Sequence, residues 1–401
     1  MTSSPDPAGA VRRRFALFAY GFRPFFWAAG AFALLAILVW LAVFATGAQP
    51  LPNQPPSLWH GHEMIYGFLC AAIAGFLLTA VPSWTGTRGF AGTPLIVLAG
   101  LWLAGRAAFW SASVIAFPVV AVCDLLFLPA LGALLARPLL RARNRNTPLL
   151  LVLAGIWATD ALFMRALATS DPVLTHTTLL VAIDIIIVLV TVIGGRIIPA
   201  FTASALRVRC RPADLRIRPW LDRMVIAAMV AVMVSDFRPS WQGAAGVLAG
   251  VAAVLHAWRL SGWRGLDAID EPLVWSLHLA YAWLPLGLAL KCVFLLTAEP
   301  WSQNWLHALT IGVTASMILA VMTRAALGHT GRALQVAKPI AVAYVLLSLA
   351  AAARVFIPPL APSESLAIVI GAGILWAGAF ALFLAVYTPI LWRPRIDSKP
   401  G

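Results

Sequence analysis

The sequence predicts an all-α fold, that of a polytopic integral membrane protein with about twelve transmembrane helices. Hydrophobic residues make up 61% of its 401 residues, and charged residues make up only 11%. A soluble domain typically carries about 25% charged residues, because its surface must face water. The 17 tryptophans are typical of the aromatic belts that lie at both surfaces of a bilayer.

Twelve apolar runs are candidate crossings. A helix of about twenty residues spans the roughly 30 Å of hydrocarbon in a bilayer, since each residue adds about 1.5 Å. The runs that approach or exceed this length are 25–46, 62–82, 93–110, 112–136, 147–168, 174–198, 219–236, 241–259, 271–297, 305–327, 338–357 and 365–392.

The distribution of basic residues agrees with this count. Lys and Arg of short loops concentrate on the cytoplasmic side of a membrane protein. With the N-terminus inside, most of the 29 Lys and Arg residues fall in predicted inner segments. The exceptions are Arg106, Arg165, Arg238, Lys291 and Arg354. Because the basic residues are spread over many connections, they form no compact face for nucleic acid. We therefore predict cytoplasmic N- and C-termini, the lipid bilayer as a partner and no nucleic acid.

A weak internal similarity suggests three related units of four helices. His62 and His307 each precede a Thr-Gly pair by 23 residues, and each is followed five residues later by a glycine, Gly67 or Gly312. The second and sixth predicted helices share a Pro-x-aromatic-Thr ending. Internal repeats are common in membrane folds. We therefore predict one transmembrane domain over residues 1–401 with pseudo-repeats at about 1–140, 141–265 and 266–401.

Histidine is the residue type that points most directly to chemistry. Ionisable side chains are costly inside a bilayer and tend to mark function. Imidazole is a usual axial ligand of haem b and a good ligand of copper. In the predicted topology four histidines begin helices at the outer side and three lie nearer the inner side, which would suit one metal centre at each face. The outer group is His60, His62, His176 and His307, and the inner group is His256, His278 and His329.

The sharpest cluster is the stretch WHGHEM at residues 59–64. Two helical residues two positions apart project in different directions, so His60 and His62 can bind one metal only if His60 lies in the preceding loop. Glu63 could orient an imidazole or carry a proton, which makes it the candidate catalytic residue. The alternative is an ordinary helix start with a first-turn acid favoured by the helix dipole.

The other histidines carry similar alternatives. His278 and His307 are metal ligands or membrane-interface residues, and His329 is a ligand or a helix cap in a Gly-flanked turn. For His176 and His256 the sequence favours ordinary packing near the membrane surface.

The charged residues within the predicted spans also carry two interpretations. Arg196 and Arg324, at inner helix ends, could bind haem propionates or extend to the lipid surface. Asp124, Asp160 and Asp184 could form a proton path or make polar contacts between helices.

Motifs along nearly the whole chain resemble the NnrS family. They are Phe22-Arg23-Pro24-Phe25-Phe26, residues 59–64, GFLLTAVPSWTG at 75–86, GGRIIPAFT at 194–202, His278 with YAWLP at 281–285, HALT at 307–310 and MTRAALGHTGR at 322–332. Ser83 stands where the family pattern usually has Asn. The resemblance implies a protein of the bacterial inner (plasma) membrane that contains haem and copper and acts in the response to nitric oxide.

The resemblance also favours ligand roles for the histidines within its motifs, without assigning them to haem or to copper. These are His60, His62, His278, His307 and His329. Two functions follow. In the first, a haem and copper centre binds nitric oxide and reduces it as an oxidoreductase, with an electron donor that the sequence does not identify. In the second, the chain is a transporter whose histidines bind a metal complex or small solute as cargo.

Overall fold

The computed structural model describes residues 15–51 and 53–397. Every regular element in these residues is a helix, which confirms the all-α prediction. Eleven helices among the described residues are long and apolar enough to cross a membrane. The remaining predicted crossing, α10 (Pro219–Asp236), is a helix of 18 residues and carries Asp222, Arg223 and Asp236. These charges make α10 more polar than the other crossings.

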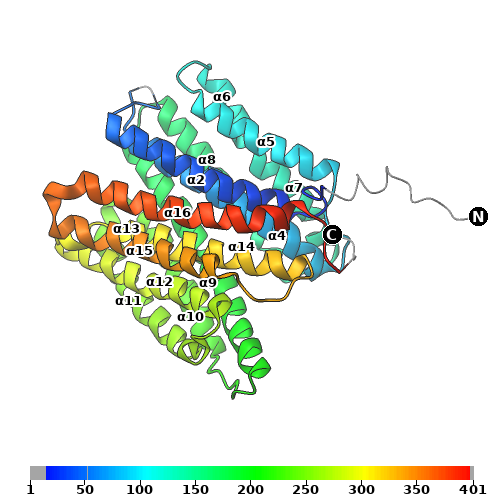
Figure 1. Ribbon diagram of the computed structural model, residues 1–401. Coiled ribbons are helices and arrows are strands. Elements are labelled where there is room, and N and C mark those ends of the chain that lie inside the picture. Colours follow the sequence, from blue (N-terminus) through cyan, green and yellow to red (C-terminus); the bar gives the residue numbers. More distant parts are fainter. Residues whose placement is uncertain (1–14, 52, 398–401) are drawn as a thin grey trace, which may run out of the picture.

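The crossings lie side by side as a bundle (Figure 1). Two of them are continuous helices that change type along their length, and a third is divided into α6 and α7. In chain order the elements are α2 (Phe22–Thr46), α3 (Pro56–His62), η1 (Glu63–Leu69), α4 (Cys70–Thr85), α5 (Thr93–Trp110), α6 (Phe117–Leu125), α7 (Phe127–Arg141), α8 (Leu149–Ala168), α9 (Pro172–Val208), α10, α11 (Gln242–Ser261), α12 (Pro272–Thr297), α13 (Trp305–His307), η5 (Ala308–Ala315), α14 (Ser316–His329), α15 (Lys338–Leu360) and α16 (Ser365–Trp392).

In three crossings a boundary differs from the sequence prediction by five residues or more. The second crossing begins at Pro56 and not at residue 62, because a proline is well suited to the first position of a helix. The fourth crossing begins at Phe117 and is interrupted at Leu126. The sixth crossing continues to Val208 and holds a proline, Pro199, in its interior. The first difference matters most, since it makes both histidines of the WHGHEM stretch helical.

The two ends of the described chain lie at the same end of the bundle, as an even number of crossings requires (Figure 1). The backbone N–H of Ala16 donates to the carbonyl of Trp392 at 2.7 Å. The Arg23 guanidinium donates to the carbonyls of Leu391 at 2.9 Å and Arg393 at 2.7 Å. We call this the inner end and the opposite one the outer end, following the predicted topology.

Three crossings form the centre of the bundle. Buried residues make up 83% of the most apolar window of α3–η1–α4, 61% of that of α9 and 67% of that of α13–η5–α14. In the other eight candidate spans of the described chain, the buried share is 44% or less. The central three are the second, sixth and tenth crossings, which carry the internal similarity. The threefold repeat itself stays a prediction.

Two of the central crossings contain a π-helical segment at the same place. The segment η1 begins directly after His62, and η5 begins directly after His307. A π-helical turn contains an extra residue and leaves backbone groups in need of other partners, and such turns are frequent at functional sites. One backbone group of η1 also has a partner outside its own helix, since the Trp102 indole N–H donates to the carbonyl of Gly67 at 3.0 Å.

The glycines of the two π-helical segments allow close packing of a neighbouring aromatic ring. A methyl group added at Gly67 would lie 2.3 Å from the ring of Phe32, and one added at Gly312 would lie 2.5 Å from the ring of Trp283. Phe32 belongs to α2 and Trp283 to α12, which are the first helices of the first and third predicted four-helix units. In both units the first helix therefore packs against the second in the same way. Each glycine is therefore required by a contact between helices.

We expect Gly67→Ala to destabilise the protein by about 1–3 kcal/mol, the usual cost of overpacking. The Phe32 ring has little room to move away, because it packs against Trp102 and Trp110. Thermal unfolding in detergent measures the effect. Gly100→Ala in α5 is the control, since its methyl group meets no atom within 4 Å. Equal unfolding temperatures for the two variants would contradict the role of this contact.

Candidate functional site

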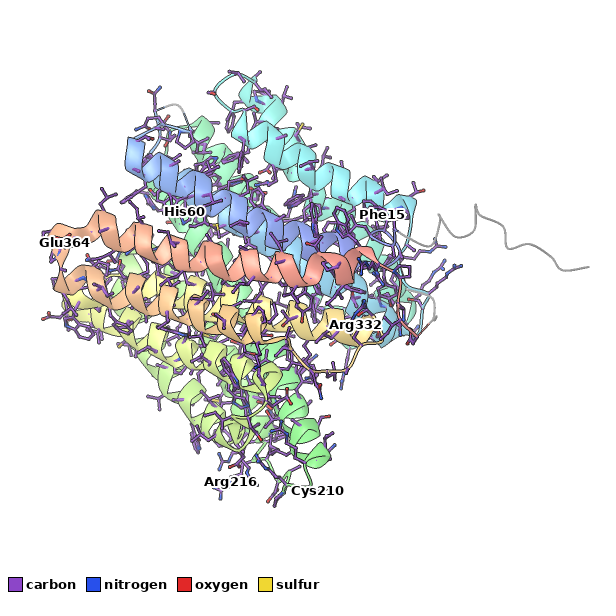
Figure 2. All side chains as sticks on the ribbon, in the orientation of Figure 1. Phe15, His60, Cys210, Arg216, Arg332 and Glu364 are labelled. Atoms are coloured by element: carbon purple, nitrogen blue, oxygen red, sulfur yellow. The ribbon has the colours of Figure 1, made fainter. Side chains whose placement is uncertain are left out.

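A cavity of about 460 Å³ lies at the outer end, where the three central crossings approach α2, α15 and α16. Its walls are mainly aliphatic and aromatic, with Trp40, Leu179 and Trp376 among them. Each central crossing adds one imidazole to the wall. These are His60 from α3, His176 from α9 and His307 from α13. Figure 2 shows His60 toward the end of the bundle that carries Glu364, away from Phe15 and Arg332.

The environment of His60 leaves one ring nitrogen available. Its imidazole stacks on the Trp40 ring with centroids 4.4 Å apart and an angle of 19° between the planes. The Nδ1 atom is buried and has no hydrogen-bond partner among the described residues. A buried polar atom without a partner is costly and calls for an explanation, and a bound ligand is one. His60 therefore lines the cavity and carries one ring nitrogen without a partner among the described residues.

The cavity also contains one permanent positive charge. Arg354, from α15, lines the cavity and donates through Nη1 to the Asn304 side-chain oxygen at 2.9 Å. A guanidinium in an otherwise apolar wall is suited to bind a carboxylate in a bidentate manner. The arrangement can therefore hold an anionic group beside the imidazoles.

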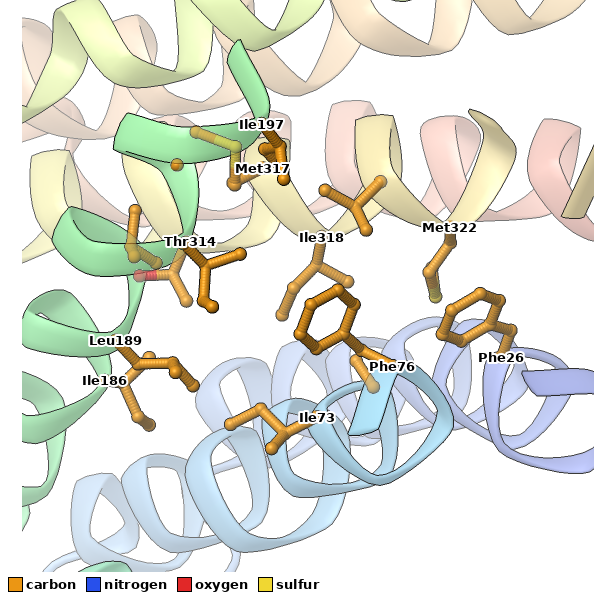
Figure 3. A pocket seen from close by; sticks show the side chains of 15 residues that line it. Phe26, Ile73, Phe76, Ile186, Leu189, Ile197, Thr314, Met317, Ile318 and Met322 are labelled. Carbon is orange, nitrogen blue, oxygen red and sulfur yellow. The ribbon is translucent and has the colours of Figure 1, made fainter. Parts of the chain in front are cut away.

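A separate apolar pocket lies between the same three crossings (Figure 3). It has a volume of about 80 Å³ and is lined by Ile73, Ile186 and Met317, among others. These side chains lie further along the helices whose residues line the histidine cavity. Apolar space in the centre of the bundle is therefore not confined to the histidine cavity.

A second cavity, of about 420 Å³, shares His176, Leu180 and Trp305 with the first and is more polar. Lys291 lies at its inner wall, fully buried, in contact with Asp236 and 3.9 Å from Asp184. Lys291 and Asp236 pair where lipid offers no water, whereas Asp184 Oδ2 has no hydrogen-bond partner among the described residues. His176 therefore stands between a polar cavity and an apolar one.

His62 projects away from both cavities into a separate polar cluster. Its ring lies between the rings of Phe109 and Phe163, with centroids at 3.8 Å and 5.0 Å. Its Nδ1 is 3.1 Å from Glu63 Oε1, and its Nε2 is 3.0 Å from Asp124 Oδ2 and 3.2 Å from Asp160 Oδ1. Because both histidines are helical, His60 and His62 belong to different sites.

Arg106 holds the acids of this cluster in place. Its guanidinium pairs with Glu63 and with Asp124, and the Trp110 indole N–H donates to the second oxygen of Glu63. All of these ionised side chains are at most 5% exposed. Glu63, the candidate catalytic residue, thus faces the cluster and not the histidine cavity.

The remaining predicted ligands lie elsewhere. The His278 Nε2 atom is 2.8 Å from Thr202 Oγ1, and the ring lies beside Trp263. His329 lies at the inner end of α14 against the rings of Tyr20 and Phe22. The structure therefore brings His60 and His307 together, and leaves His62, His278 and His329 in three other places.

The predicted propionate-binding arginines are also distant from the histidine cavity. Arg196 donates to the Asn146 side-chain oxygen at 2.7 Å, and the Arg324 guanidinium lies 3.9 Å from the centroid of the Phe201 ring. Neither residue lines the cavity that holds His60 and His307. Among the described residues, Arg354 is the arginine that lines this cavity.

Three site residues were not predicted from the sequence to be ligands or catalytic residues: His176, Arg354 and Arg106. A signal for the two arginines was present, because both are exceptions to the positive-inside distribution, as are Lys291 and Arg238. Four of those five exceptions line the cavities or the polar cluster. A basic residue outside the predicted inner segments was therefore the most informative sequence feature after histidine. For His176, no local pattern separates a cavity wall from a membrane surface.

We expect Arg106→Met to lower stability by about 3–5 kcal/mol, because it leaves buried carboxylates without their cation. Thermal unfolding and yield of monodisperse protein in detergent report this. The matched control is Arg165→Met, which removes an exposed arginine from α8. If both variants unfold at the wild-type temperature, the carboxylates do not depend on Arg106.

Comparison with known sequences assigns the chain to a family. No curated protein matches the chain significantly in sequence. The family described as NnrS protein matches residues 16–395, which is nearly the whole chain of 401 residues. The match includes all twelve crossings, the three cavity histidines and the polar cluster around His62. A match of this extent establishes membership, and the chain belongs to the NnrS family.

Proposed function

We propose that this membrane protein binds nitric oxide at a haem centre in the histidine cavity and acts in the response to nitric oxide. The observation that supports this proposal most strongly is that three imidazoles, one from each central crossing, line one apolar cavity at the outer end. Family membership supports the same function. We place the protein in the bacterial inner membrane with both termini cytoplasmic, as the distribution of basic residues predicts.

The cavity residues fit a haem b. His60 offers an unpartnered buried nitrogen, and His307 faces the same space from another helix. The aromatic and aliphatic walls suit a porphyrin, and Arg354 suits a propionate. The sequence has no CxxCH motif, so the group would be held without covalent attachment. When bound, the haem iron supplies a coordination position for a small gas.

His176 is the imidazole left for copper. It lines the cavity shared with His60 and His307 and also faces the polar second cavity. Imidazole nitrogen is a suitable copper ligand. Copper at this wall would therefore lie in the same space as the haem.

The apolar pocket below the cavity suits the proposed ligand (Figure 3). Nitric oxide is small and uncharged, so it dissolves readily in hydrocarbon. The pocket lies between α4, α9 and α14, at hydrocarbon depth, and its lining offers no charged group. The pocket could therefore hold the gas near the histidine cavity, within the hydrocarbon depth of the membrane.

The polar second cavity favours reduction as a further step. Reduction of two nitric oxide molecules to nitrous oxide and water takes up two protons and two electrons. The contact of the second cavity with His176 gives protons a polar route from the outer end, past Asp236 and Lys291. The electrons would come from an external one-electron donor.

We expect purified protein to show a Soret absorption band that shifts when nitric oxide is added to the reduced form. His60→Gln and His307→Gln should each lower the haem content by at least about tenfold, since even outer partners of metal ligands are worth that much. His256→Gln is the control, because His256 is buried but hydrogen-bonds to Tyr281 at 2.7 Å. Colourless wild-type protein would reject haem binding and favour the transporter alternative.

A second expectation concerns Arg354. Arg354→Met should weaken haem binding about tenfold, because a hydrogen bond to a charged group contributes about 1.5–3 kcal/mol. Haem titration of the apoprotein, followed by absorbance, measures the dissociation constant. Arg354→Lys keeps the charge and should lose less affinity, whereas equal loss in both variants would argue against an ionic role.

A further inference from the structure

We infer that His62, Asp124 and Asp160 form a binding site for a divalent metal ion, separate from the histidine cavity. One imidazole nitrogen and two carboxylate oxygens converge there, all within 4.8 Å of one another. They come from three different crossings, α3, α6 and α8. The tertiary structure thus assembles a ligand set that no sequence spacing suggests.

The distances are close to those of neighbouring ligands on one ion. The His62 Nε2 atom lies 3.0 Å from Asp124 Oδ2 and 3.2 Å from Asp160 Oδ1. Nitrogen and oxygen ligands bind zinc at about 2.0–2.2 Å, so two tetrahedral ligands of one ion are separated by about 3.3–3.6 Å, a few tenths of an ångström more than the separations here. The site therefore needs only small shifts to accept an ion.

One of the three ligand atoms has no hydrogen-bond partner among the described residues. Asp124 Oδ2 is buried and makes no hydrogen bond within the described chain, although it lies close to His62. The other oxygen of Asp124 pairs with Arg106. An unsatisfied carboxylate oxygen in lipid is expensive, and a metal ion would satisfy it.

The charge of the cluster also calls for a cation. Glu63, Asp124 and Asp160 are three carboxylates, and Arg106 is the guanidinium that pairs with two of them. With a neutral His62, these four groups carry a net formal charge of −2. Burying such a charge away from water is highly unfavourable. A divalent ion brings the sum to zero.

The imidazole is held in the orientation that the site requires. Phe109 and Phe163 lie on its two faces, so the ring edge alone is free to meet polar groups. Glu63 Oε1 lies 3.1 Å from Nδ1 and can accept a hydrogen bond from the Nδ1–H group, which leaves Nε2 as the metal-binding atom. A carboxylate on the second ring nitrogen is the usual support of a metal-bound histidine.

The ligand set selects the chemical class of the ion. Two carboxylate oxygens with one imidazole suit Zn²⁺ or Mn²⁺, whereas Cu⁺ prefers thiolate and thioether sulfur. No sulfur atom belongs to the cluster formed by the described residues. We therefore expect Zn²⁺ to bind more tightly than Cu⁺.

The test is calorimetric titration of full-length, detergent-purified protein with Zn²⁺ after treatment with a chelator. Wild-type protein should bind one Zn²⁺ per chain at this site, and Asp160→Asn should weaken that binding by at least about tenfold. Asp222→Asn is the matched control, because it removes a carboxylate that pairs with Arg259 in another crossing. Absence of Zn²⁺ binding by wild-type protein, or equal weakening in both variants, would overturn the inference.

A second measurement decides the matter if Asp160→Asn does not fold. X-ray absorption of the wild-type protein loaded with Zn²⁺ should show a shell of nitrogen and oxygen with one imidazole, and sulfur ligands would reject the site. Haem content is recorded on the same samples. Since the site shares no residue with the histidine cavity, loss of Zn²⁺ binding with an intact Soret band, or the reverse, separates this inference from the proposed function.

Discussion

Every ionisable side chain in this bundle has to find its partner inside the protein, because the surrounding lipid supplies none. Arg106 pairs with Glu63 and Asp124, and Lys291 is paired with Asp236 near Asp184. Once these pairs are complete, the remaining unsatisfied atoms become informative. His60 Nδ1 and Asp124 Oδ2 are two of them. His60 lines the histidine cavity, and Asp124 Oδ2 lies 3.0 Å from His62 Nε2.

The same constraint applies to the backbone and shapes the central crossings. A helix in lipid must satisfy its own N–H and C=O groups, so irregular turns are tolerated only where protein covers them. The π-helical segments η1 and η5 lie in the most buried crossings, and the Trp102 indole satisfies a carbonyl in the first of them. Their glycines admit aromatic rings from adjacent helices. The irregular turns thus directly follow His62 and His307. Contacts with neighbouring side chains offset the energetic cost of these turns.

Two proposed sites lie back to back on one helix. His60 faces the central cavity and His62 faces the polar cluster, because residues two positions apart lie on different sides of a helix. Met64 and Gly61 line the cavity beside His60, while Glu63 joins the cluster beside His62. The two proposed sites therefore share a helix but no lining or ligand residue.

The sequence by itself determined the polytopic membrane class and the position of His60, His176 and His307 at one end of the bundle. Composition and the length of apolar runs decide these features, since hydrocarbon thickness and the cost of burying charge act on every residue locally. Only the tertiary structure decided which histidines share a cavity and that Arg354, not Arg196 or Arg324, stands beside them. It also joined Asp124 and Asp160 to His62, from crossings far apart in sequence. Helix rotation and neighbour choice depend on packing between whole faces, and no local pattern contains that information.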